Sequence, residues 1–236
     1  MKHGTDKVGR DERGFGHRYY PVYSLYLDPL RDYPITFFEI GFSTGNSAET
    51  WEEYLPLADV HEFEIACNET SPSYEGGKNF VMLSSRYNKW RFEKKRLHCG
   101  SVNDFAWMRH ELDSIDYPDV VVDDGGHGPK EMILAFFFMF PQIKPGGLFF
   151  MEDIVESYVV GEAGFIDQVL RPLLDDLIRR DEHARKMPSR RKFPDITSLL
   201  QDISCHEGIC VFRRNKQPST RDIDPFAIAK IASINV

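Results

Sequence analysis

The chain has 236 residues, of which 42% are hydrophobic and 28% charged. This length and composition suit one domain of generous size with a sizeable core, and they argue against a largely disordered chain. The formal net charge of −8 argues against nucleic acid or an anionic membrane as the main partner. The longest apolar stretch, residues 132–141, is far shorter than a membrane span.

The cysteines form no CxxC pair, and the last two do not have a usual zinc spacing. They are Cys67, Cys99, Cys205 and Cys210. We therefore expect reduced thiols in a cytoplasmic protein. Residues 1–14 contain no apolar run, so we expect no signal peptide.

Apolar runs of strand length recur along the first two thirds of the chain. They occupy residues 35–40, 59–65, 96–100, 119–123 and 146–152. Continuous apolar runs are typical of strands that are buried on both faces of a parallel sheet. Segments with helical features alternate with them, at residues 46–55, 101–112, 129–140 and 163–180. This alternation predicts an α/β fold with a largely parallel sheet.

The last third of the chain departs from this alternation. Residues 181–195 are charged and loop-like, and residues 196–215 have the pattern of a hairpin that turns at "HEG". Together with the five earlier strands, this antiparallel hairpin predicts a Rossmann-like, mostly parallel seven-stranded sheet with helices on both faces. The predicted organisation is a cap segment (1–34), a main domain (35–215) and a tail (216–236).

The connection over residues 66–95 is long for two neighbouring strands. Its end, "RYNKWRFEKKR" (86–96), is rich in basic residues. Two interpretations stay open for this basic run, the solvated face of a helix or a binding surface for an acidic partner, and we favour the first.

A glycine turn follows the first predicted strand. Gly41 and Gly45 would let the backbone approach a ligand. A dinucleotide would place its pyrophosphate there, but Glu39 would repel it and the third glycine of that motif is missing. Glu64, at the end of the second strand, is placed to hold ribose hydroxyls. These acids favour a nucleoside with an ammonium and a sulfonium, S-adenosylmethionine; a tight structural turn is the alternative.

Acidic residues end the fourth and fifth predicted strands. Asp123 and Asp124 follow one strand, and Glu152 and Asp153 follow the other. The carboxyl ends of neighbouring parallel strands meet at one edge, where four carboxylates would repel one another unless a cation joined them. A hard divalent cation such as Mg²⁺ prefers oxygen ligands, and His127 could take up a proton at neutral pH. Alternatively, the acids only cap helices and His127 only packs.

Five motifs carry a resemblance to an enzyme family. They are "HGTDK" (3–7), "GHRYYPVY" (16–23), "FFEIGFSTGNSAETWEEYLP" (37–56), "VVVDDGGHGP" (120–129) and "FPQIKPGGLFFMEDIVESY" (140–158). With them the chain resembles the class I S-adenosylmethionine-dependent O-methyltransferases of the macrolide-sugar type. That family includes the macrocin, mycinamicin and rhamnosyl O-methyltransferases.

The resemblance implies Mg²⁺-dependent methyl transfer from S-adenosylmethionine to a hydroxyl of a small molecule, such as the sugar of a natural product or a polyphenol. It implies His127 as the general base. The implied metal ligands are Asp124, Glu152 and Asp153. The implied cofactor-binding residues are Thr5, Lys7, Glu39, Gly41, Ser43, Gly45, Glu64, Ser101 and Asp123. The implied substrate residues are His17, Tyr19 and Tyr158. We expect no membrane or nucleic-acid partner, and a homo-oligomer stays open.

One loop departs from the family pattern. The family usually has glycine-aspartate-glutamine after the third strand, near the adenine, whereas residues 99–104 are "CGSVND". Ser101 therefore replaces the acid, and Asp104 is the acid that could compensate for it. Other functions stay open: a protein that binds S-adenosylmethionine without catalysis, and a dinucleotide or nucleotide-sugar enzyme. An RNA or protein methyltransferase has only the basic run over 86–96 in its favour.

Overall fold

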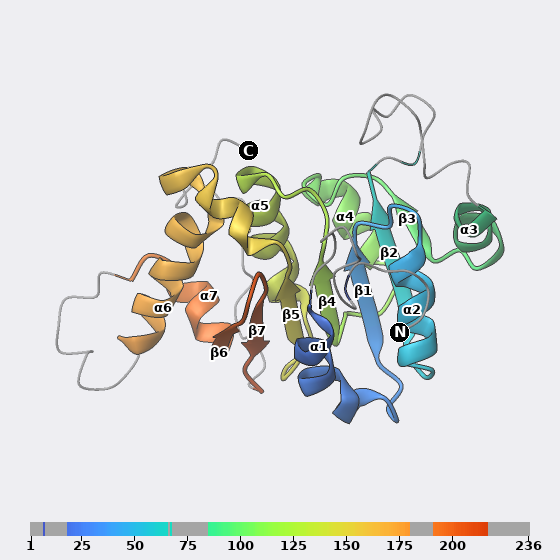
Figure 1. The fold of residues 1–236 in the computed structure, drawn as a ribbon, viewed down its shortest axis with the longest axis horizontal. Helices are drawn as coiled ribbons and strands as arrows, with labels where there is room; N and C mark the ends of the chain where they lie inside the picture. The colour runs from blue at the N-terminus through green and yellow to red at the C-terminus, as the bar shows by residue number, and fades with distance from the viewer. Residues whose placement is uncertain (1–6, 8–17, 66, 68–84, 180–190, 217–236) are drawn as a thin grey trace.

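A seven-stranded sheet with the strand order β3-β2-β1-β4-β5-β7-β6 forms the centre of the fold (Figure 1). The computed structural model of the chain describes residues 7, 18–65, 67, 85–179 and 191–216. The parallel strands are β1 (Thr36–Ile40), β2 (Asp59–Glu64), β3 (Leu97–Cys99), β4 (Val120–Asp123) and β5 (Leu148–Met151). The hairpin of β6 (Leu200–Cys205) and β7 (Cys210–Arg214) adds two antiparallel strands at one edge. The predicted mixed sheet is confirmed.

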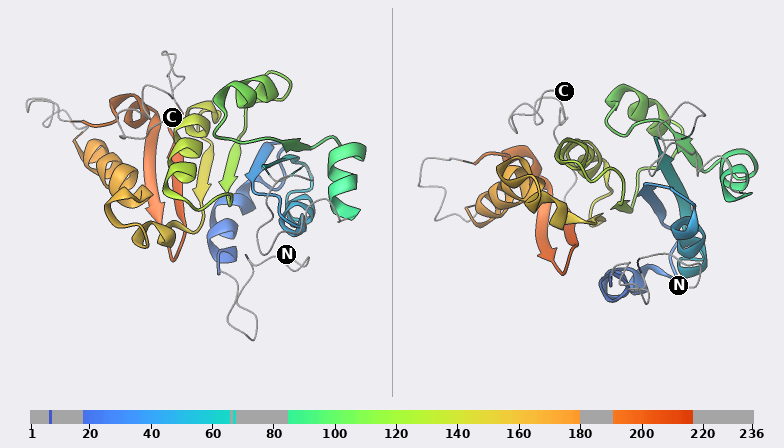
Figure 2. Two further views of the ribbon diagram at one scale, coloured as in Figure 1. Left: turned by 90° about the horizontal axis from the view of Figure 1, so that it is seen from above. Right: turned by 45° about the horizontal axis from the view of Figure 1, so that its top comes forward.

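Helices cover both faces of this sheet (Figure 2). On one face α1 and α2 form a core in which Tyr23 and Trp51 pack with Phe150. On the other face α4, α5, α6 and α7 form a second core, where Phe136 packs against Phe149. The helices are α1 (Tyr20–Leu27), α2 (Asn46–Tyr54), α4 (Phe105–Leu112), α5 (Pro129–Met139), α6 (Arg171–Ile178) and α7 (Pro194–Leu199). No helix in the described part of the chain is long and apolar enough to cross a membrane.

Short helical segments link these elements. They are η2 (Asp28–Leu30), α3 (Ser85–Asn88), η4 (Lys89–Glu93), η5 (Phe140–Gln142), η6 (Ile154–Tyr158), η7 (Gly161–Ala163) and η8 (Ile166–Leu170). Most of the basic run over 86–96 lies in α3 and η4, and its last three residues follow η4. Four of its side chains pair with acids. Arg86 (2.7 Å) and Lys89 (3.9 Å) pair with Glu49 of α2, Lys94 pairs with Glu52 of α2, and Arg96 pairs with Asp59 of β2 (2.7 Å). These pairs tie the run to the body of the domain.

The start of the predicted C-terminal hairpin is wrong, because residues 194–199 form the helix α7 before β6 begins. Pro194 suits a first helical turn, where its missing N–H is not needed. The carboxylate of Asp176 accepts hydrogen bonds from the backbone N–H of Lys192 (3.0 Å) and of Phe193 (2.6 Å) and so fixes the entry to α7. These contacts come from α6, which sequence spacing could not reveal.

The expectation of reduced thiols is also wrong. Cys67 is bonded to Cys99, with 5.5 Å between the Cα atoms, and Cys205 is bonded to Cys210, with 4.1 Å between them. The sheet explains both pairs. Cys205 and Cys210 are register partners in the β6–β7 hairpin. Cys99 is the register partner of Glu64, and Cys67 follows Glu64 by three residues.

Candidate active site

The carboxyl ends of β1, β4 and β5 meet at the candidate site. Ile40 pairs with Asp123, and Asp123 pairs with Met151, so the residues that follow these strands are neighbours. The backbone N–H of Asp124 donates to the Ile40 carbonyl at 3.0 Å, and that of Glu152 donates to the Asp123 carbonyl at 3.0 Å. In open α/β sheets this edge is where ligands bind.

Three carboxylates converge on one buried ammonium, and we call this group the inner cluster. Lys7 Nζ lies 2.6 Å from Asp124 Oδ2, 2.8 Å from Glu152 Oε1 and 3.5 Å from Glu39 Oε1. The side chains of Lys7, Glu39 and Glu152 are almost wholly buried. The hydroxyl of Tyr23 also donates to Glu152 Oε1. The inner cluster therefore gathers three carboxyl groups around one buried ammonium.

The charges in the inner cluster shift one another's titration. Burial lowers the pKa of Lys7, but Asp124, Glu152 and Glu39 together outweigh it and leave that pKa well above its usual value. Burial, and then the charge of Asp124, raises the pKa of Glu152. Burial also raises the pKa of Glu39, against the opposing effect of Lys7. Such displaced pKa values are typical of sites that bind or transform a charged ligand.

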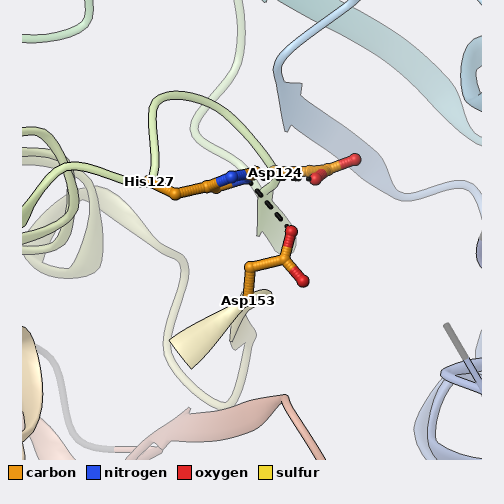
Figure 3. Close-up of side chains that lie close together, drawn as sticks. All are labelled: Asp124, His127 and Asp153. Atoms are coloured by element: carbon orange, nitrogen blue, oxygen red, sulfur yellow. Dashed lines mark ion pairs between the residues drawn. The ribbon is translucent and has the colours of Figure 1, made fainter. Parts of the chain in front are cut away.

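The outer trio consists of Asp124, His127 and Asp153 (Figure 3). His127 Nε2 lies 3.2 Å from Asp153 Oδ2 and 3.6 Å from Asp124 Oδ1. One ligand-capable atom from each of the three residues lies within 4.8 Å of the others, which is close enough for a shared cation. The Asp124 carboxylate raises the pKa of His127 against the effect of partial burial, and Asp153 adds to this rise.

Asp124 belongs to both groups, with Oδ2 toward Lys7 and Oδ1 toward His127. The consecutive residues Glu152 and Asp153 diverge: Glu152 enters the inner cluster and Asp153 the outer trio. Asp153 has a left-handed backbone with a φ of 49°, a conformation that costs about 1 kcal/mol for a residue with a side chain. The Tyr19 hydroxyl donates to Asp153 Oδ1 at 2.8 Å and holds it there.

The glycine turn lies beside these carboxylates. Gly41 has a φ of 103°, and a Cβ there would overlap the carbonyl oxygen of Asp124, so this position requires glycine. Gly45 also has a positive φ, of 75°. The backbone N–H of Ser43 donates to Glu64 Oε2 at 3.0 Å, which links the turn to the end of β2.

The remaining predicted residues are not members of these two groups, although Asp123 lies close enough to Asp124 and His127 to interact with their charges. Ser101 Oγ accepts a hydrogen bond from the backbone N–H of Asn103 at 3.2 Å. Asp123 is buried, and burial raises its pKa to about 7; its Oδ1 accepts from the N–H of Gly125 at 3.3 Å. Tyr158 is 69% exposed at the end of η6. Thr5 and His17 lie outside the described residues.

Sequence reasoning missed two members of this region. Tyr23 lies one helical turn after Tyr19, and that spacing on α1 was the available signal for two hydroxyls on one face. Glu62 is the register partner of Glu39 and is completely buried. An acid in the middle of the predicted strand over 59–65 was the signal there, because buried strands rarely contain a charged residue.

Comparison with known proteins finds relatives of this chain among curated O-methyltransferases. The 8-demethyl-8-alpha-L-rhamnosyl tetracenomycin-C 2'-O-methyltransferase of Streptomyces olivaceus is 29% identical over 205 residues, which cover 82% of this chain and 47% of that protein. The demethylmacrocin O-methyltransferase of Streptomyces fradiae is 39% identical over 160 residues, or 64% of this chain and 35% of that protein. The chain is similar to O-methyltransferases of natural-product sugars. The resemblance predicted from the motifs is confirmed.

A solved structure shares the fold. The MycE methyltransferase from the mycinamycin biosynthetic pathway, in complex with Mg, SAH and mycinamycin VI, matches with a TM-score of 0.64 and 17% identity. The match covers 86% of this chain and 50% of that one. No protein-family model matches the chain. The chain spans less than half the length of the curated relatives it matches.

Proposed function

We propose that the chain is an S-adenosylmethionine-dependent and Mg²⁺-dependent O-methyltransferase that acts on a sugar hydroxyl of a small natural product. The observation that carries the proposal is the convergence of Asp124, His127 and Asp153 at the ends of β4 and β5, beside the glycine turn. The O-methyltransferase relatives support it.

The donor atoms fit a hard divalent cation. Asp124 and Asp153 offer carboxylate oxygens within reach of one position, and Glu152 follows β5 directly beside them. Mg²⁺ commonly binds to one or a few protein carboxylates and keeps several water ligands, so these oxygen donors suit it. When bound, Mg²⁺ would lower the pKa of the acceptor hydroxyl and fix its direction.

The residues around the glycine turn fit the cofactor. Both carboxylate oxygens of Glu39 are buried, and the cation beside them is Lys7 Nζ, at 3.5 Å from Oε1. Such a carboxylate suits the ammonium of the methionine part of the cofactor. Glu64, at the end of β2, suits the ribose hydroxyls, and Gly41 leaves room for the backbone to approach.

The side chains of the outer trio have distinct roles in this proposal. His127 removes the proton from the acceptor hydroxyl, and the two flanking carboxylates strengthen it as a base by stabilising its protonated form. Tyr19 orients Asp153 through its hydrogen bond. The rest of the rate acceleration comes from aligning the oxygen, methyl carbon and sulfur for in-line displacement. Tyr158 is exposed and free to contact the acceptor.

A second candidate is a protein that binds the cofactor without catalysis. The observation in its favour is the loop after β3, where Ser101 replaces the expected acid and already accepts a bond from Asn103. Asp104, the acid that could compensate, caps α4 by accepting from the N–H of Trp107 at 3.1 Å.

Calorimetric titration with S-adenosylmethionine and S-adenosylhomocysteine, with and without Mg²⁺, tests the proposal. We expect both nucleosides to bind and a metal signal that Asp124→Asn removes. Glu156→Gln is the matched control, because Glu156 is an exposed acid on η6. Failure of the wild-type chain to bind either nucleoside would refute both candidate functions.

A further inference from the structure

The ammonium of Lys7 is completely buried and surrounded by acids from three strands. Its Nζ lies 2.6 Å from Asp124 Oδ2 and 2.8 Å from Glu152 Oε1, with Glu39 Oε1 at 3.5 Å. Burying an ammonium costs several kcal/mol unless close carboxylates compensate for it. Lys7 is therefore held in place by the negative charge of the inner cluster.

Asp124 and Glu152 are two of the metal ligands expected from the sequence, and oxygens of both are engaged by Lys7. Lys7 and Tyr23 both bond Glu152 Oε1, and Lys7 takes Asp124 Oδ2. Mg²⁺ requires its oxygen ligands at about 2.1 Å, and it would lie within a few ångströms of the ammonium. Two positive charges at that distance in a buried site repel strongly. Mg²⁺ and the Lys7 ammonium would therefore compete for Glu152 Oε1.

We propose that Lys7 is an exchangeable counter-ion that occupies the Glu152 side of the metal site in the ligand-free chain and leaves when Mg²⁺ binds. This inference rests on the proposed Mg²⁺ dependence. With Lys7 in place, Asp124, His127 and Asp153 still form a ligand-capable group among the described residues. With Lys7 displaced, Glu152 joins Asp124 and Asp153. Competition from Lys7 weakens the apparent affinity for Mg²⁺.

A lysine variant separates this exchange from a purely structural role. Lys7→Met removes the charge and keeps the length of the side chain, so calorimetry with Mg²⁺ alone should show at least about tenfold tighter binding than in wild type, because no buried pair must be broken first. Adding Glu152→Gln to Lys7→Met should abolish this gain. Lys144→Met is the control, because Lys144 pairs with Asp119 at 2.9 Å before β4. Unchanged or weaker Mg²⁺ binding by Lys7→Met would overturn the exchange.

A second measurement follows the chemical reactivity of Lys7 in the wild-type chain, so it does not require the Lys7→Met variant to fold. Lys7 should resist acylation by an amine-reactive reagent without ligand, because its side chain is inaccessible. Saturating Mg²⁺ alone should make Lys7 reactive, as followed by peptide mass spectrometry, while Lys144 stays reactive throughout. If Mg²⁺ binds while Lys7 stays protected from acylation, the proposed exchange is refuted but the Mg²⁺-dependent function is not. Absence of Mg²⁺ binding in both wild type and Lys7→Met would refute the metal-dependent function itself.

Discussion

A buried pair of histidines should make the fold sensitive to acid. His61 of β2 and His98 of β3 lie side by side, with 2.9 Å between His61 Nδ1 and His98 Nε2. His98 Nδ1 lies 2.6 Å from Glu111 Oε2, and Arg96 Nη1 lies 3.2 Å from His61 Nε2. If Arg96 donates to His61, His61 to His98 and His98 to Glu111, every contact is satisfied with both rings neutral. An added proton on His61 would have to break the bond from Arg96, and Asp59 Oδ2, at 3.4 Å from His61 Nε2, compensates only in part for the burial of the charged ring.

The size of the stability loss in acid follows from the lowered pKa of His61. Burial lowers its pKa from 6.5 to about 4, although Asp59 opposes this shift. The unfolded chain therefore takes up the proton first, so the stabilisation is complete above pH 6.5 and is lost as the pH falls toward 4. At 1.36 kcal/mol for each pKa unit, the loss between pH 7.5 and pH 4 amounts to about 3 kcal/mol.

Urea denaturation over this pH range, with wild type and His61→Gln, measures the effect. The glutamine amide can still donate to His98 and accept from Arg96, but it does not titrate. Wild type should lose about 3 kcal/mol more unfolding free energy than His61→Gln between pH 7.5 and pH 4. Comparing the two chains removes the contribution of the buried carboxyl groups. His110→Gln, at an exposed position of α4, should follow wild type. If the unfolding free energies of wild type and His61→Gln fall by the same amount between pH 7.5 and pH 4, the reasoning is refuted.

Other predictions concern the site. His127→Ala should abolish methyl transfer while the affinity for S-adenosylmethionine, measured by calorimetry, stays within about threefold of wild type; a large loss of affinity would make His127 structural. Tyr19→Phe removes the bond that orients Asp153 and should lower kcat by about 10- to 100-fold, with cofactor affinity unchanged; an unaltered kcat would contradict that role. Gly41→Ala should lower the free energy of unfolding by about 2 to 4 kcal/mol in urea denaturation, because its Cβ would overlap the Asp124 carbonyl and φ is positive; wild-type stability would show that the turn relaxes freely.

The parallel part of the fold could be predicted because its signals are local. The strand from Val120 to Asp123 begins with three consecutive valines, and all four of its residues are buried in the sheet. Pro129 marks the first turn of α5, as proline does at a position that needs no N–H donor. The strand ends then placed Asp124 and Glu152 at the same edge, and the structure brings both into contact with Lys7.

Contacts between distant segments could not be predicted. Lys7 reaches Glu152 across 145 residues, and nothing in local spacing distinguishes a buried lysine from an exposed one. Cys67 and Cys99 are paired because β2 and β3 are neighbours in the sheet, which the cysteine spacing does not reveal. The divergence of Glu152 and Asp153 depends on the left-handed backbone at Asp153, a conformation that sequence did not indicate.

Methyl transfer itself tests the central claim most directly. The wild-type chain would be incubated with isotopically labelled S-adenosylmethionine and a panel of glycosylated polyketides and catechols, with Mg²⁺ or with a chelator, and the products followed by mass spectrometry. The proposed function predicts a labelled methyl ether on a sugar hydroxyl that requires Mg²⁺ and disappears in His127→Ala. Tight cofactor binding with no labelled product from any acceptor would contradict it and favour a binding protein without catalysis.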